Sequence, residues 1–121
     1  MEPEEVAARV EREVREYEYR APAGARGKAW TPARVLAELA ALERALILPR
    51  RAEFEIRDAG VQLTDPEPEI APYWLVARDS DGTLVFYDEA ADDFGLGEVT
   101  PEGNFETVGV RGELVNIFLA R

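Results

Sequence analysis

Residues 73–89, YWLVARDSDGTLVFYDE, constrain the fold more than any other stretch, because they predict a β-hairpin. The flanks are rich in β-branched and aromatic residues. Asp81 and Gly82 suit a two-residue type I′ turn, which needs φ > 0 at both central positions. That turn fixes the pairing of the two strands. The predicted pairs are Val76–Tyr87, Ala77–Phe86 and Arg78–Val85.

Both faces of this hairpin are apolar. A strand pair of this kind has to be covered on both sides, so we expect it in the middle of a sheet. One predicted face consists of Trp74, Val76, Val85 and Tyr87, and the other of Leu75, Ala77, Leu84 and Phe86.

A helix is predicted over residues 3–17, because Val6, Val10 and Val14 recur every four residues and Tyr17 continues the stripe. Three valines form a narrow apolar face, and valine is a mediocre helix former. We therefore expect this helix to be held by docking, either on its own domain or on a partner.

A second helix is predicted to begin at Pro32, with Thr31 as its N-cap, and to end before Pro49, which disfavours the α region at the preceding residue. Its regular apolar stripe marks it as the expected main core helix. The stripe consists of Val35, Leu39, Leu42 and Leu46, widened by Leu36.

Further strands are indicated on both sides of the central hairpin. Residues 53–57 alternate strictly, which directs Phe54 and Ile56 inward, and a turn at 58–60 leads to a return strand at 61–64. Residues 65–72 read as an extended, proline-rich connector. A third hairpin is expected from strands at 98–100 and 105–110, joined by a turn at 101–104.

Residues 113–121 suit either a helix or a strand. We prefer the helix, because Gly112 followed by an acidic residue resembles a helix start. The segments together predict an α+β fold in which two N-terminal helices pack on an antiparallel sheet. The sheet has about five or six strands built from consecutive hairpins, and a short C-terminal helix follows. A length of 121 residues predicts a single domain, 1–121.

Histidine and cysteine are both absent, which excludes imidazole bases, thiol nucleophiles, disulfides and zinc sites of the usual kind. Gly27-Lys28 fails as a phosphate loop, since Pro22 and Ala29 stand where glycine and Ser or Thr are required. A calcium loop counted from Asp79 also fails, because Ala90 occupies the position of its last glutamate. We expect no cofactor, no catalytic residue and no metal ligand, and a protein without enzymatic activity.

Met1 is followed by acidic residues instead of a charged and then apolar leader, so no secretory signal is expected. No apolar run approaches the roughly 20 residues needed to span a bilayer. We expect a cytoplasmic protein with no membrane partner.

Charge is distributed unevenly along the sequence. Residues 62–106 hold 12 of the 25 acidic residues and a single base, Arg78, out of 14, while the chain carries a net charge of −11. Such a field repels nucleic acid and attracts a basic partner or a cation. The alternative is that the acidity only keeps a small protein soluble.

The densest group of carboxylates follows the central hairpin, at a strand end, where functional groups often lie. Tyr17, Tyr19 and Phe94 lie outside the strongest core patterns and are candidate interface anchors, with core packing as the alternative. The predicted partner-binding residues are Asp88, Glu89, Asp92, Asp93 and Phe94.

The leading hypothesis is a non-enzymatic binding protein that presents these carboxylates to a basic protein, most concretely an immunity or antitoxin-type inhibitor. A second hypothesis is a small metal-binding or hydrolytic domain that uses the same carboxylates. A third is a homo-oligomeric structural or regulatory module that pairs through the valine face of the N-terminal helix.

Overall fold

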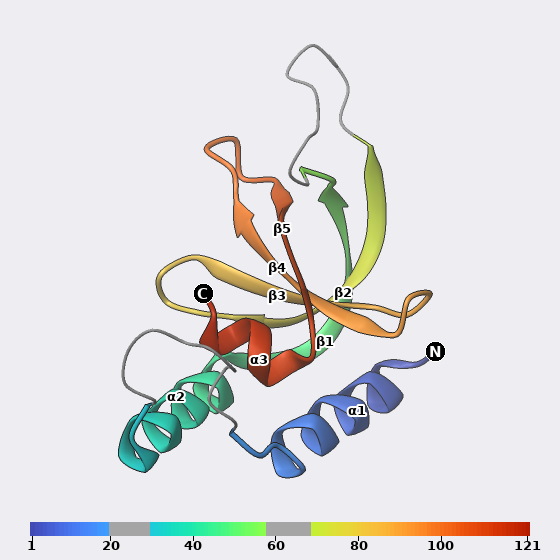
Figure 1. Cartoon of the computed structure of the whole chain (residues 1–121). Helices are drawn as coiled ribbons and strands as arrows, with labels where there is room; N and C mark the ends of the chain where they lie inside the picture. The colour runs from blue at the N-terminus through green and yellow to red at the C-terminus, as the bar shows by residue number, and fades with distance from the viewer. Residues whose placement is uncertain (20–29, 58–68) are drawn as a thin grey trace.

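The computed structural model describes residues 1–19, 30–57 and 69–121 (Figure 1). The predicted turn at 58–60, the return strand at 61–64 and residues 65–68 of the connector at 65–72 lie outside the described residues, as does the Gly27-Lys28 pair. The elements are α1 (Pro3–Arg15), α2 (Pro32–Ala45), β1 (Leu46–Glu55), β2 (Ile70–Arg78), β3 (Thr83–Asp88), β4 (Asp93–Val99), β5 (Phe105–Gly112) and α3 (Leu114–Leu119).

The predicted α+β fold is confirmed, with two N-terminal helices, five strands from consecutive hairpins and a short C-terminal helix. The sequence did not indicate that the strands close into a barrel in the order β1-β2-β3-β4-β5. Neighbouring strands are antiparallel along the chain, whereas the closing pair is parallel. This β1–β5 seam consists of two residue pairs, Phe54–Phe105 and Glu55–Glu106.

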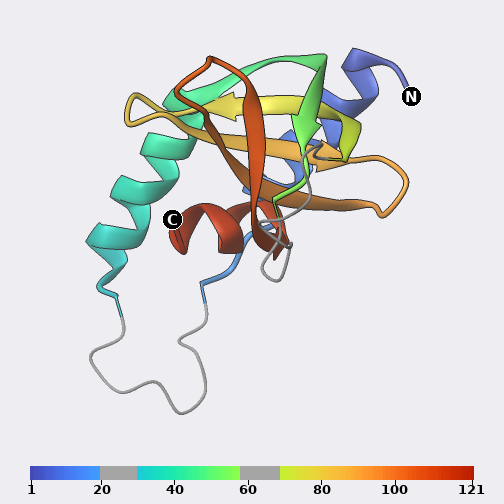
Figure 2. The same cartoon turned by 90° about the horizontal axis from the view of Figure 1, so that it is seen from above.

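The three helices form a layer on one side of the barrel (Figure 1). The view from above shows the short α3 near the middle of that layer, with α2 beside it (Figure 2). α3 contacts α1 as well as α2, and both N-terminal helices also contact β2. No helix among the described residues is long and apolar enough to cross a membrane.

The central hairpin is buried on both faces, as predicted. Its outward face packs against the helices and its inward face fills the barrel. The outer core includes Val6, Val10, Leu42, Trp74, Val76, Ala77, Val85, Tyr87, Phe94, Leu114 and Phe118. The inner core consists of Phe54, Tyr73, Leu75, Leu84 and Phe86, with smaller contributions from Ile56 and Phe105.

The predicted type I′ turn is wrong. Asp79 N–H donates to the Thr83 carbonyl at 2.8 Å and Gly82 N–H donates to the Asp79 carbonyl at 3.1 Å, so Ser80 to Gly82 form a three-residue loop. Only Gly82 adopts a positive φ, of 92°, which is the usual form of a type I turn followed by a left-handed residue. The turn at 101–104 repeats this design, with Gly103 at φ 87°.

The predicted register is therefore also wrong. The longer loop shifts the pairing by one residue, which gives Ala77–Val85, and a bulge between Leu75 and Ala77 shifts it once more, which gives Trp74–Tyr87. A shift by one residue exchanges the two faces of a strand, and a second shift exchanges them back. At Trp74 and Leu75, on the far side of the bulge from the turn, the side chains therefore lie on the predicted faces. Between bulge and turn the alternation is reversed, and Ala77 joins the outer core.

α1 forms as predicted and docks on its own chain. Val6 and Val10 are 0% and 4% exposed, and Val14 packs at the edge of the outer core. The valine face is thus occupied within the chain, and an oligomer would have to use other residues of this helix.

α2 differs from expectation at its end and in its burial. Thr31 caps it, accepting a hydrogen bond from Arg34 N–H at 3.1 Å, but the helix ends at Ala45 and Pro49 lies inside β1. Only Leu42 and Ala45 of the helix are buried, while Leu36 is 67% exposed. The apolar stripe was read correctly as helical, yet α2 is not the main core helix, because it contacts the core only through its last turns.

Two further strand limits are corrected. β2 begins at Ile70 instead of Tyr73 and pairs directly with β1, so the end of the predicted connector belongs to the barrel. β4 begins at Asp93 instead of Glu98, because Gly95 and Gly97 are strand residues here. The C-terminal helix preferred over a strand is confirmed as α3.

Gly95 and Gly97 face the barrel interior and allow the aromatic rings to fill it. A Cβ atom at Gly95 would lie 2.2 Å from Phe86 Cζ, and one at Gly97 would lie 2.7 Å from the Glu106 carbonyl and 3.1 Å from Phe54 Cε2. The rings of Phe54 and Phe86 have centroids 5.0 Å apart. The inner core thus requires strand positions without side chains on β4.

We expect Gly95→Ala to destabilise the fold by about 1–3 kcal/mol, because the new methyl group overpacks a filled interior. Urea unfolding would measure the loss. Phe86→Leu alone should also destabilise, but the double variant Gly95→Ala/Phe86→Leu should lose less than the two single losses together, since a smaller side chain leaves room for the methyl group. Simple additivity would contradict the contact between Gly95 and the Phe86 ring.

Candidate functional site

The carboxylates predicted as the binding site form the turn between β3 and β4, here called the acidic turn (Asp88–Asp93). Asp88 and Asp93 face each other as the last strand pair. Asp88 Oδ1 accepts hydrogen bonds from the N–H groups of Ala90 at 3.0 Å and Ala91 at 3.2 Å. Asp92 has a φ of 53°, which aspartate tolerates better than most residues. Turn geometry therefore explains part of the acid content of this segment.

Basic groups from other parts of the chain pair with each acid of the turn. Arg111 of β5 binds both Asp88 and Asp93, with Arg111 Nε 3.2 Å from Asp93 Oδ2. Arg9 of α1 binds Asp92, with Arg9 Nη1 2.7 Å from Asp92 Oδ1. The acidic turn is thus balanced electrostatically within the chain.

Glu89 completes this pattern. Its Oε1 lies 2.9 Å from the Met1 amino group, and its Oε2 lies 3.7 Å from Arg51 Nη2. The last predicted residue, Phe94, is 1% exposed and belongs to the outer core, with its ring centroid 5.0 Å from that of Tyr87. The structure brings the four acids together on one turn but directs Phe94 away from solvent.

Tyr87 links the outer core to the acidic turn. Its hydroxyl donates to Asp92 Oδ1 at 2.6 Å. Burial, and then the hydrogen bond to Asp92, raise the pKa of Tyr87 to about 12. The same hydrogen bond, followed by the charge of Arg9, lowers the pKa of Asp92 below its usual value.

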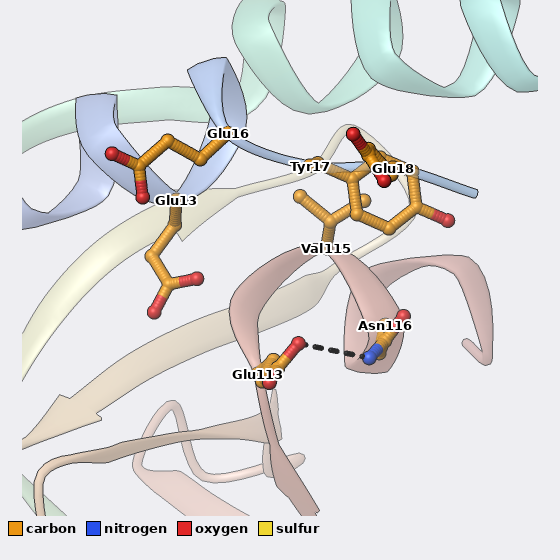
Figure 3. A pocket seen from close by; sticks show the side chains of 7 residues that line it. All are labelled: Glu13, Glu16, Tyr17, Glu18, Glu113, Val115 and Asn116. Carbon is orange, nitrogen blue, oxygen red and sulfur yellow. Dashed lines mark hydrogen bonds between the residues drawn. The ribbon is translucent and has the colours of Figure 1, made fainter. Parts of the chain in front are cut away.

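A second acidic surface lies where α1 ends beside the start of α3, a region that the sequence did not single out. We call this cavity of about 510 Å³ the acidic groove. Figure 3 shows Glu13 directed from α1 toward the start of α3, and Tyr17 lying over Val115. The lining residues are Glu13, Glu16, Tyr17, Glu18, Glu113, Val115 and Asn116.

Four of these seven side chains are carboxylates, and no lysine or arginine is among the described lining residues. Glu13 forms an ion pair with Arg9, one turn earlier on α1, with Arg9 Nη2 3.1 Å from Glu13 Oε1. Glu113 accepts a hydrogen bond from Asn116 Nδ2 at 3.2 Å. The described lining of the groove thus contains four carboxylates and no basic side chain, and Glu16 is an acid there with no ion pair to a described residue.

The groove acids differ in how they affect helix stability, because Glu113 is the N-cap of α3, where a carboxylate is favourable, whereas Glu16 lies at the opposite kind of helix end. Glu16 is the C-cap of α1, and a helix C-terminus carries a partial negative charge that disfavours carboxylates nearby. Arg12 and Arg15 lie in the last turn and offset this, but neither lines the groove. Of the groove acids, Glu16 therefore lies where helix energetics would favour a cation instead.

Sequence reasoning missed this groove for two reasons. Residues 1–61 are nearly neutral in sum, which drew attention to the acidic half of the chain. Glu113 joins the groove only because β5 returns the chain to α1. One signal was available, since Glu13 and Glu16 are three residues apart on a helix and lie close to Tyr17, a candidate interface anchor.

Metal binding by the predicted carboxylates receives no support from the geometry of the described residues. Among residues 1–19, 30–57 and 69–121, no group of three or more acidic side chains is arranged to hold a metal ion. Comparisons with protein-family models, with curated proteins and with solved structures found no match to this chain.

The Tyr87–Asp92 contact predicts a defined alkaline response. A folded pKa of about 12 lies above the ordinary value of 10, so the contribution of Tyr87 to stability is complete below pH 10 and declines between about pH 10 and 12. Titration of tyrosine absorbance should show this late ionisation, and Tyr87→Phe should remove it. Asp92→Asn should lower the pKa of Tyr87 but leave it above the ordinary value of 10, because burial is the larger cause of the elevation.

Tyr19→Phe serves as the control and should leave the late ionisation in place. Persistence of that ionisation in Tyr87→Phe would show that another tyrosine produces it.

Proposed function

We propose that this chain is a small acidic binding protein without enzymatic activity, and that it receives a basic protein partner in the acidic groove. The observation that supports the proposal is the cavity of about 510 Å³ with four glutamates in its lining, on a chain of net charge −11. A group of carboxylates with no basic side chain in its described lining raises the local concentration of cationic side chains and accelerates encounter with a basic surface.

The acidic groove suits this role better than the acidic turn. A partner that used Asp88, Asp92 or Asp93 would first have to displace Arg111 or Arg9, whose guanidinium groups already bind those oxygens. Breaking a formed, charge-assisted hydrogen bond reduces the net gain from any new one. A partner that binds Glu16 does not have to displace an arginine of the described residues, because Glu16 forms no ion pair with any of them. Predicted binding through Asp88, Glu89, Asp92 and Asp93 is retained as a supporting role outside the groove.

The lining also matches the shape of a basic side chain. The half-buried Tyr17, which lies over the buried Val115, offers apolar surface against which the methylene stem of a lysine or arginine can pack, while the carboxylates surround the charged end. Asn116 adds an amide oxygen as a neutral acceptor. Partly enclosed contacts of this kind contribute more than fully exposed ion pairs.

An immunity or antitoxin-type inhibitor is the most concrete version of this proposal. Such a protein blocks a nuclease by placing carboxylates where the phosphates of the substrate would lie. The small size, the acidic net charge and the absence of histidine and cysteine are consistent with inhibition by binding.

The test is binding of a fluorescent peptide of eight alternating lysine and arginine residues, measured by anisotropy. Glu13→Gln/Glu16→Gln/Glu113→Gln should weaken binding by about tenfold or more, because three close contacts are worth about 0.5–1 kcal/mol each. Binding should also weaken as salt is raised.

The matched control is Glu11→Gln/Glu43→Gln/Glu102→Gln, which removes the same charge from exposed positions outside the groove. It should weaken peptide binding by no more than about twofold, an effect of net charge alone. Equal losses in both triple variants would show that the peptide responds only to total charge, and the groove would lose its proposed role.

A further inference from the structure

A second cavity has the opposite character and lies between the last turns of α2 and the β2–β3 turn. The yellow β2–β3 turn lies beside the end of α2 in both views (Figure 1, Figure 2). The cavity has a volume of about 630 Å³, and we call it the arginine cavity. Its polar lining consists of Arg44, Arg78, Asp79, Ser80 and the backbone of Gly82.

Neither arginine of this cavity has an ion pair with a described residue. Arg9, Arg51, Arg57, Arg111 and Arg121 bind carboxylates. Arg34 and Arg50 lie over aromatic rings, and Arg12 and Arg15 of α1 also lack an ion pair with a described residue. What distinguishes Arg44 and Arg78 is that both line the same cavity.

The one acid in the described lining is already engaged. Asp79 Oδ1 accepts a hydrogen bond from Ser80 N–H at 2.8 Å, and Asp79 Oδ2 accepts one from Arg121 Nε at 3.2 Å. Arg121 also binds Glu38, with its Nη1 2.8 Å from Glu38 Oε2. Arg121 thus binds both Asp79 and Glu38. Asp81, next to Ser80 in the turn, accepts a hydrogen bond from Thr83 N–H at 2.8 Å. Arg44 and Arg78 form no ion pair with any of these acids.

We propose that the arginine cavity binds a phosphate-type dianion, either free or as the phosphate group of a small molecule. Two guanidinium groups match its double negative charge, and their planar N–H donors suit its tetrahedral oxygens. The Ser80 hydroxyl in the lining is a third donor. This inference is independent of the binding of a basic partner at the acidic groove.

A purely structural role accounts for only one of the two arginines. Arg44 lies in the last turn of α2, where a cation stabilises the negative end of the helix. Arg78 ends β2 and has no comparable helix end on its own element. Both side chains are exposed, and a shared anionic ligand would provide a partner for Arg78 as well as for Arg44.

The experiment is an NMR titration of the full chain with inorganic phosphate at constant ionic strength, monitoring the amides of Ser80 and Gly82 and the side-chain Nε–H groups of Arg44 and Arg78. We expect saturable shifts at these groups with a dissociation constant of about 1 mM or lower. The double variant Arg44→Gln/Arg78→Gln should weaken binding by about tenfold or more.

Arg12→Gln/Arg15→Gln is the matched control, since it removes the same charge from exposed positions on α1. It should change the phosphate affinity by less than about twofold. Absence of saturation up to about 10 mM phosphate, or equal losses in both double variants, would overturn the proposal. Parallel titrations with sulfate and acetate test the ligand class, and acetate binding as tightly as phosphate would overturn the assignment to a dianion.

Discussion

The contact between two strand glycines and two phenylalanine rings is the constraint on which the rest of the structure depends. Gly95 and Gly97 leave space for Phe86 and Phe54, and the filled interior lets five short strands close into a barrel. Closure determines where β5 ends. α3 follows β5 at once and packs beside α1, so the acidic groove exists only because the barrel closes. Core packing and the candidate binding surface are thus parts of one arrangement.

Charge counted along the sequence and charge on the surface lead to different conclusions in this protein. Residues 62–106 carry the excess acid, yet Arg9, Arg51 and Arg111 come from outside that range and pair with the acidic turn. The nearly neutral N-terminal half contributes most of the acidic groove, because Glu13, Glu16 and Glu18 line it and the arginines of α1 do not. Folding redistributes charge, and binding responds to the resulting surface.

Much of the fold was predictable, because alternation of period two and period 3.6 directly reflects which side chains are buried. The two-sided burial of Trp74 and Phe86 followed from pattern alone. The register did not, since it depends on one extra loop residue and one bulge, and neither changes the local composition. The end of α2 was predicted wrongly for a related reason. Pro49 lies at an irregularity of β1, and a proline tolerated there looks the same in sequence as one that ends a helix. The groove required Glu113, about a hundred residues from Glu13, and no local pattern carries such a relation.

The parallel seam of β1 and β5 has a consequence for the order in which the chain folds. The pairs β2–β3, β3–β4 and β4–β5 each join strands that are neighbours along the chain, so each can form as a local hairpin. The seam joins segments about fifty residues apart, and closing it costs more loop entropy. With only two residue pairs, it has little to stabilise it before the inner aromatic cluster is packed. The seam is therefore the natural last step of folding and the first place to open during native-state fluctuations. Amide hydrogen exchange would report such opening as weak protection at Glu55 and Phe105, beside strongly protected central strands.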